Sequence, residues 1–220
     1  MQRKNDTELR QQVLREMKWD TRVAWGHIGV KVSDGVVTLT GVVASYAEKE
    51  SAERAAHRVA GVLDVANDLE VKVTNIRTDT EIARAVRSAL EWDVLVPDEK
   101  IRSTVSNGWV TLEGEVSTLR ERVDAERAVR HLVGVAGIVN RIEVAPQKVD
   151  PEELRLNIED ALERRAEREA ERLRIEVKDG QIDLWGRVHS WREKRAVLGS
   201  IIHAPGVNRV NDHLRIDPYF

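Results

Sequence analysis

The sequence predicts an α+β protein built from three tandem αββαβ modules. Each module is expected to be a two-layer domain in which two helices cover one face of a small three-stranded mixed sheet. Three observations lead to this prediction. The same motifs recur twice along the chain, the hydrophobic period changes in the same order within each repeat, and turn and capping residues lie where the period changes.

The repeat is clearest at three turn glycines in the segments VSDGVVTLTG, VSNGWVTLEG and VKDGQIDLWG: Gly35, Gly108 and Gly180. They lie 73 and 72 residues apart, and the same offsets hold for the glycines before the closing segments: Gly61, Gly134 and Gly206. A unit of this length is a domain and not a solenoid repeat. We expect three domains, residues 1–74, 75–147 and 148–220, with linkers short enough for the units to pack together.

Each repeat opens with apolar residues four positions apart, which places them on one helix face: Leu9, Val13 and Met17; Ile82, Val86 and Leu90; Leu154, Ile158 and Leu162. Asp6 and Asp79 precede two of these helices and are expected to cap them, and Pro151 suits the first turn of the third. The charged segment ALERRAEREAERL predicts a longer first helix in the third repeat, with charge pairs four residues apart.

A hairpin follows the first helix. Ile28, Val30 and Val32 alternate with other residues, as in a strand with one buried face. Asp-Gly or Asn-Gly comes next in every repeat, and these pairs favour a tight turn that needs positive φ angles. A second alternating strand then begins.

The second helix is predicted from a capping box, SYAE, TLRE or SWRE. The hydroxyls of the capping residues are expected to accept a hydrogen bond from the backbone three residues on: Ser45, Thr118 and Ser190. The glutamates are expected to reach back to the capping residue's own N–H: Glu48, Glu121 and Glu193. A last alternating strand closes the unit and leaves the second face of the sheet open for a function.

This order of elements, with the D/N-G turn and the closing pattern GVxxVxNxLxV, resembles the BON domain, named for bacterial osmotic-stress and nodulation proteins. The resemblance covers residues of about 6–73, 79–145 and 151–217, and is looser in the first half of the third unit. It implies a non-enzymatic αββαβ module of osmotic or envelope stress, with relatives that bind phospholipid surfaces, one that binds potassium, and many that are exported to the periplasm.

Composition narrows the classes of function. A formal charge of −3 and a surface rich in both signs argue against a nucleic-acid partner, which needs a concentrated basic face. The chain has no cysteine, so disulfides and thiolate metal sites are excluded. No segment is apolar enough for a transmembrane span. Charged residues interrupt the first twenty positions, which predicts a cytoplasmic protein, or a periplasmic one if a leader was removed before Met1.

No catalytic, metal or cofactor site is expected. The six histidines have no metal-binding spacing, and the carboxylates alternate with Arg and Lys on helices, which is typical of solvated faces. The glycines fit turns and helix ends and form no phosphate-binding loop. An enzyme would need a polar cluster found in one unit alone, and the sequence reveals none.

The tryptophans are the candidate interaction residues. Trp19 and Trp92 share a repeat position after the first helix and are expected to seal that helix end against the sheet. Trp191, beside the third capping residue, is expected to pack at the edge of the core. These three tryptophans are therefore interpreted as structural.

Trp109 and Trp185 have the opposite parity to the buried residues of their strands, so they are predicted to point away from the helices. Either they pack between neighbouring units, or they form, together with Trp25 in a loop, a surface for a partner. The leading hypothesis is a scaffold that contacts phospholipid headgroups or another protein through three modules. The alternative is a cytoplasmic sensor of potassium or a small molecule.

Overall fold

The computed structural model describes residues 5–72, 77–147, 149–165 and 173–218, and it contains three modules of the same order. Module 1 comprises α1 (Asp6–Trp19), β1 (Ile28–Ser33), β2 (Val36–Val43), α2 (Tyr46–His57) and β3 (Asp64–Val71). Module 2 comprises α3 (Asp79–Trp92), β4 (Ile101–Ser106), β5 (Trp109–Val116), α4 (Leu119–Val129) and β6 (Gly137–Val144). Module 3 comprises α5 (Pro151–Arg165), β7 (Arg174–Lys178), β8 (Gln181–Val188), α6 (Trp191–Ile202) and β9 (Arg209–Ile216).

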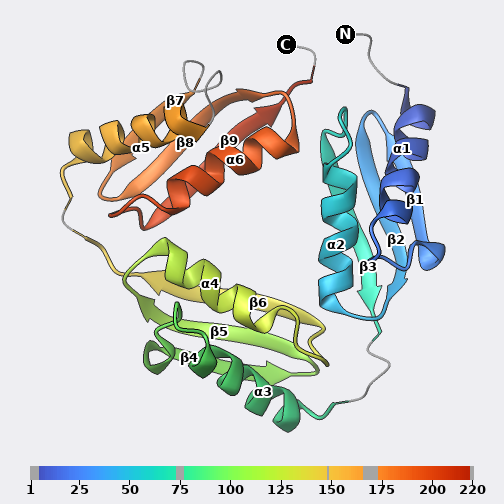
Figure 1. Cartoon of the computed structure of the whole chain (residues 1–220), viewed down its shortest axis with the longest axis horizontal. Helices are drawn as coiled ribbons and strands as arrows, with labels where there is room; N and C mark the ends of the chain where they lie inside the picture. Colours follow the sequence, from blue (N-terminus) through green and yellow to red (C-terminus); the bar gives the residue numbers. More distant parts are fainter. Residues whose placement is uncertain (1–4, 73–76, 148, 166–172, 219–220) are drawn as a thin grey trace.

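Each module has its own three-stranded sheet, with the strand orders β1-β2-β3, β4-β5-β6 and β7-β8-β9. In each sheet the first two strands form an antiparallel hairpin, and the last strand pairs in parallel with the middle one. The parallel pair needs a crossover, which the second helix provides. The predicted fold class is therefore confirmed (Figure 1).

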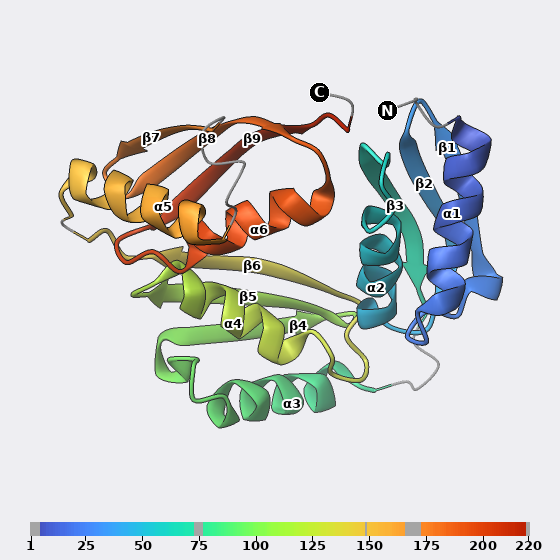
Figure 2. The same cartoon turned by 45° about the horizontal axis from the view of Figure 1, so that its top comes forward.

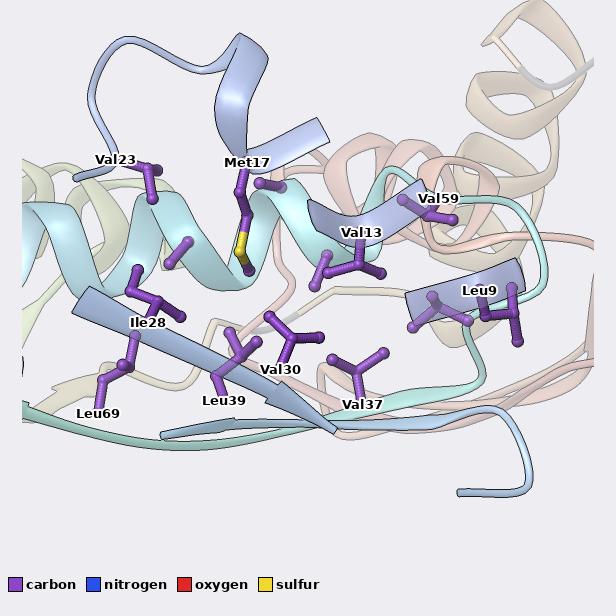
Figure 3. Close-up of a cluster of buried hydrophobic side chains, with 14 of the residues drawn as sticks. Leu9, Val13, Met17, Val23, Ile28, Val30, Val37, Leu39, Val59 and Leu69 are labelled. Carbon is purple, nitrogen blue, oxygen red and sulfur yellow. The ribbon is translucent and has the colours of Figure 1, made fainter. Parts of the chain in front are cut away.

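The core of module 1 lies between its two helices and one face of its sheet (Figure 3). Leu9, Val13 and Met17 of α1 point at Val37 and Leu39 of β2, and all five side chains are buried. The four-residue spacing of the helix and the two-residue spacing of the strand thus meet in one apolar layer. Modules 2 and 3 have equivalent cores.

The hairpin turns adopt the predicted conformation. They are bound by the acidic residues that were expected to cap the first helices. Asp34 and Gly35 have φ angles of 50° and 80°. The N-caps of α1 and α3 are Asn5 and Thr78, one residue earlier than predicted. Instead of capping its helix, Asp6 accepts hydrogen bonds from the N–H groups of Asp34 and Gly35, at 2.8 and 3.1 Å.

Asp79 forms the same link in module 2, where its carboxylate accepts from the N–H groups of Asn107 and Gly108 at 2.8 and 2.9 Å. At the first position of the helix the side chain points across to the hairpin, so a carboxylate there joins two elements that are distant in sequence. Pro151 takes this position in module 3 and begins α5, as expected.

The capping hydroxyls of the second helices behave as predicted. Ser45, Thr118 and Ser190 accept from the backbone three residues on. The return bond to the capping residue is present for Glu121. Glu48 and Glu193 instead accept from the residue before the cap, Ala44 and His189. Glu48 also accepts from Ala24 N–H at 2.8 Å, which anchors the loop after α1.

The predicted burial of Trp19 and Trp92 is wrong. They are 84% and 88% exposed. Trp19 lies two positions beyond the buried Met17, about 200° around the helix axis, so it points away from the sheet. The helix end is sealed by valines from the following loops, Val23 in module 1 and Val96 in module 2. The predicted extension of the third module's first helix beyond Arg165 lies outside the described residues.

The modules contact one another in a closed ring, with α2, α4 and α6 facing its centre (Figures 1 and 2). The first residue of each of these helices packs onto the next module. Tyr46 contacts the core of module 2, Leu119 belongs to the core cluster of module 3, and Trp191 stacks on His57 of module 1. Trp191 was expected at the edge of its own core, but it belongs to an interface between modules. The arrangement is a pseudo-threefold, head-to-tail ring within one chain.

Candidate functional site

The loop after α1 presents two tryptophans to solvent. Trp19 ends α1, and Trp25, 42% exposed, begins a short 3₁₀ turn, Trp25–His27. The ammonium group of Lys18 lies 4.2 Å from the centroid of the Trp25 ring, which is a cation–π distance. The end of α1 and the loop after it therefore expose two tryptophans and a lysine that contacts one of them.

Asp20 fixes the shape of this loop. Its carboxylate, almost fully buried, accepts from Arg22 Nε and Nη2 at 2.8 and 2.7 Å and from Arg58 Nη2 at 2.9 Å. The hydrogen bonds from Arg22, and then those from Arg58, hold the pKa of Asp20 well below its usual range, although burial acts in the opposite direction. The loop between Trp19 and Trp25 is thus a charged and constrained turn.

The equivalent loop of module 2 is apolar. Trp92 is followed by Val94, which is 96% exposed, and by Leu95, which is half exposed. Asp93 takes the place of Asp20 and accepts from the N–H of Leu95 at 3.0 Å. Three apolar side chains thus project from one loop. The corresponding segment of module 3 lies outside the described residues. We call the exposed tips of modules 1 and 2 the Trp loops, defined by Trp19, Trp25, Trp92, Val94 and Leu95.

Trp109 and Trp185 lie on the open sheet faces, and the contacts described below are with residues of their own modules. Trp109 is 52% exposed and lies over Gly137 of β6, where a Cβ atom would come within 2.5 Å of the ring. Trp185 is flanked by Arg174 on one neighbouring strand and by His213, 5.2 Å away between centroids, on the other. As interaction residues, Trp109, Trp185 and Trp25 remain predictions.

The open face of module 3 carries a polar cluster that sequence reasoning missed. Asp183 Oδ1 accepts from Asn211 Nδ2 at 3.0 Å and lies 3.3 Å from His213 Nε2. The cluster continues to Trp185 and Arg174 through the ring contacts described above. Modules 1 and 2 have Thr38 and Thr111 at the position of Asp183. The alternation of residues along β8 and β9 indicated that these side chains lie on the same sheet face. Their proximity depends on how the two strands are aligned, which the alternation does not give.

A cleft of about 570 Å³ lies between modules 2 and 3. The charged residues that line it are three arginines and two glutamates: Arg122, Arg141, Arg209, Glu115 and Glu143. Arg122 donates to Asn140 O at 3.3 Å and Arg141 to Glu113 at 3.4 Å, so these two guanidinium groups are only weakly engaged. The cleft is polar, and its size suits a small molecule.

Within the residues that the structure covers, no group of three or more His, Cys, Asp or Glu side chains is arranged to hold a metal ion. Over the same residues, no helix has the length and apolar character needed to cross a bilayer.

The fold and these surfaces define a class of protein: a tandem array of small αββαβ domains whose distinguishing residues are exposed on loops and open sheet faces. The BON domain family matches the chain three times, over residues 5–73, 78–146 and 150–218. The chain belongs to this family, in agreement with the resemblance found in the sequence.

One curated relative is "Osmotically-inducible protein Y" of Escherichia coli (strain K12), 31% identical over 119 residues, which are 51% of this chain and 59% of the relative. The chain thus matches somewhat more than half of that protein's length. Two solved structures of CdsD, a structural protein of the type III secretion system of Chlamydia trachomatis, align with 96% and 98% of this chain and with 92% and 100% of their own. Both are 11% identical with a TM-score of 0.27, too low to define the fold of this chain.

Proposed function

We propose that this protein is a non-enzymatic binding protein of the osmotic or envelope stress response that contacts phospholipid surfaces through its Trp loops. Membership of the BON family and the similarity to an osmotically-inducible protein support the stress-related part. The same similarity supports the periplasmic alternative over the cytoplasmic one. The observation that carries the lipid contact is the exposure of Trp19 and Trp92 at equivalent positions of two modules.

Exposed tryptophans at loop tips are costly in water and favourable at the boundary between lipid headgroups and acyl chains. Trp92, Val94 and Leu95 offer apolar area for insertion. Lys18 beside Trp25 offers a positive charge to an anionic headgroup. Two loops in one chain would raise the apparent affinity above that of either loop, provided that both reach the same surface.

The test is co-sedimentation with phosphatidylglycerol-containing vesicles at low salt, with phosphatidylcholine vesicles as the neutral control. We expect binding to the anionic vesicles, and a loss of about tenfold or more in apparent affinity for the double variant Trp19→Ser, Trp92→Ser, by the avidity argument. Trp109→Ser is the matched control, because it removes an exposed tryptophan from an open sheet face. No binding of the unchanged protein would refute the lipid proposal. If only Trp109→Ser lost vesicle binding, the lipid-binding surface would instead be the open sheet face.

A small-molecule sensor is the second candidate, and the cleft between modules 2 and 3 supports it. Its mixture of arginines and glutamates suits a small ligand that carries both charges. Potassium, the alternative ligand, would need converging carbonyl or carboxylate oxygens and stays a prediction. Thermal-shift measurements distinguish a potassium sensor from a sensor of small zwitterions, since a ligand that binds the folded state raises the melting temperature. One series compares potassium chloride with sodium chloride, and the other adds zwitterionic amino acids.

A further inference from the structure

Three junctions close the ring of modules, and one of them has no covalent linker. Modules 1 and 2 are consecutive in the chain, as are modules 2 and 3. Module 3 meets module 1 only through non-covalent contacts, at the start of α6 and the end of α2. Whether the ring is open or closed therefore depends on this junction.

Trp191 and His57 are the centre of this junction. Their ring centroids lie 3.8 Å apart with an angle of 20° between the planes. The indole Nε1–H of Trp191 donates to the carbonyl oxygen of Leu63 at 3.1 Å. His57 is buried, and its Nε2 atom has no hydrogen-bond partner in the described part of the chain. An imidazole with an unpartnered Nε2 atom is thus enclosed between two modules.

Charged groups surround His57 from both sides. Glu53 on its own helix and Asp64 at the start of β3 belong to module 1, whereas Arg195 and Lys194 of α6 belong to module 3. The Lys194 ammonium lies 5.2 Å from the centroid of the Trp191 ring. Burial lowers the pKa of His57, and Arg195 and Lys194 lower it further, while Glu53 and Asp64 act in the opposite direction.

The other two junctions place different residues at the equivalent positions. The positions of Trp191 and His57 are held by Tyr46 and Arg130 at the junction of modules 1 and 2. At the junction of modules 2 and 3 they are held by Leu119 and Ile202. A histidine does lie near the second of these: His203 Nδ1 is 3.2 Å from Arg120 Nη1, but its side chain is exposed and can turn to water when protonated.

We propose that the contact of Trp191 with His57 is an acid-sensitive latch, which keeps the ring closed at neutral pH and releases module 3 from module 1 when His57 takes up a proton. This inference stands independently of the proposed lipid contact. An imidazolium at this place would bury an unpaired N–H donor and would face Arg195 and Lys194, and both effects favour the open ring.

The direction of the pH effect follows from linkage. The closed ring binds fewer protons at His57 than the open ring, because burial disfavours the charged imidazole. The contribution of His57 to closure is therefore complete above the ordinary pKa of histidine, about 6.5. As the pH falls below this value, the closing equilibrium constant decreases by up to about tenfold per pH unit, until the lowered pKa of the closed state is reached.

The experiment measures distances between modules with pairs of spin labels. The chain has no cysteine, so cysteines can be introduced at three exposed and equivalent positions, Glu70, Glu143 and Arg215. Between pH 8 and pH 5, we expect the Glu70→Cys, Arg215→Cys distance distribution to lengthen and broaden. The pairs at positions 70 and 143, and at 143 and 215, are expected to keep their distributions, because their junctions contain no buried histidine in the described structure.

Two variants assign the response to His57. His57→Phe retains an aromatic ring for the stack but takes up no proton, so it is expected to remain closed at pH 5. His131→Phe is the matched control, because His131 is exposed and its loss is expected to leave the response unchanged. Trp191→Ala, with its circular dichroism unchanged, is expected to be open at both pH values.

Three results would overturn the latch. The first is an unchanged distance between positions 70 and 215 in the wild-type chain at pH 5. The second is an opening of His57→Phe equal to that of the wild type. The third is a change confined to positions 143 and 215, which would place the response at His203 and Arg120.

Discussion

Glu50 of α2 and Arg130, at the end of α4, form an ion pair between modules 1 and 2, with 3.0 Å between Oε2 and Nε. The same two positions hold Val123 and Ile202 at the next junction, and Arg195 and His57 at the third. These equivalent positions thus hold an ionic pair at the first junction, two apolar residues at the second, and a histidine and an arginine at the third. Three different chemistries at equivalent positions favour the correct neighbour over the wrong one.

Replacing one or both residues of this ion pair should show how much its partial burial affects the free energy of unfolding. Burial raises the pKa of Glu50, and Arg130 offsets that effect. Arg130→Ile therefore should lower the free energy of unfolding by about 1–3 kcal/mol, because Glu50 loses its closer partner and keeps only Arg54, at 3.6 Å. The double variant Glu50→Val, Arg130→Ile copies the next junction and should return to within about 1 kcal/mol of the wild type. Calorimetry checks both, and a single variant as stable as the wild type would contradict the prediction.

The glycine of the middle strand should tolerate no side chain. Gly114 has a φ of 145°, and a Cβ atom there would lie 2.1 Å from the carbonyl oxygen of Lys100. Gly114→Ala is expected to cost about 3 kcal/mol or more, since backbone must move. Gly199→Ala is the matched control: it lies in α6 with open space around it and should stabilise by about 0.5–1 kcal/mol. Urea unfolding of the two variants should therefore shift in opposite directions.

The link between Asp79 and the hairpin turn should be measurable in module 2. Asp79→Ala removes the acceptors for the N–H groups of Asn107 and Gly108 and is expected to lower stability by about 1–2 kcal/mol. Asp79→Asn keeps one acceptor and should lose less. Amide hydrogen exchange at Asn107 and Gly108 provides the local measurement. Unchanged protection there in Asp79→Ala would show that the carboxylate does not hold the turn.

Asp20 should contribute a pH-dependent share of stability. Because Arg22 and Arg58 lower its pKa in the folded state, the folded chain binds fewer protons at Asp20 than the unfolded chain does. Its contribution is complete above the ordinary value of 3.8 and decreases as the pH falls through that value toward the lowered pKa. Asp20→Asn is expected to cost about 1–3 kcal/mol at pH 7, and less at pH 2. Parallel curves of unfolding free energy against pH for the two proteins would exclude this role.

The elements of each module were predictable because their determinants are local. The apolar spacing of Leu9, Val13 and Met17, the Asp-Gly turn at Gly35 and the capping hydroxyl of Ser45 each act within a few residues of themselves, and all three recur in register. The role of Asp6 was less predictable, because a first-turn carboxylate can cap its own helix or bond to a distant backbone.

The surfaces depended on neighbours that periodicity does not specify. Parity predicted that Trp109 and Trp185 face away from the helices, but not that Arg174 and His213 flank Trp185. The exposure of Trp19 was not predicted, because the side chain that covers the helix end instead, Val23, comes from an irregular loop. Asp183 and His213 lie 30 residues apart, and only the parallel register of β8 and β9 brings them together.

The sequence by itself determined three copies of one αββαβ domain, because hydrophobic period, turn chemistry and capping are short-range properties that survive in each copy. Tertiary structure alone decided that these copies close into a ring in which Trp191 meets His57. That contact joins residues 134 positions apart in different modules, and it depends on the relative orientation of whole domains, which no local pattern encodes.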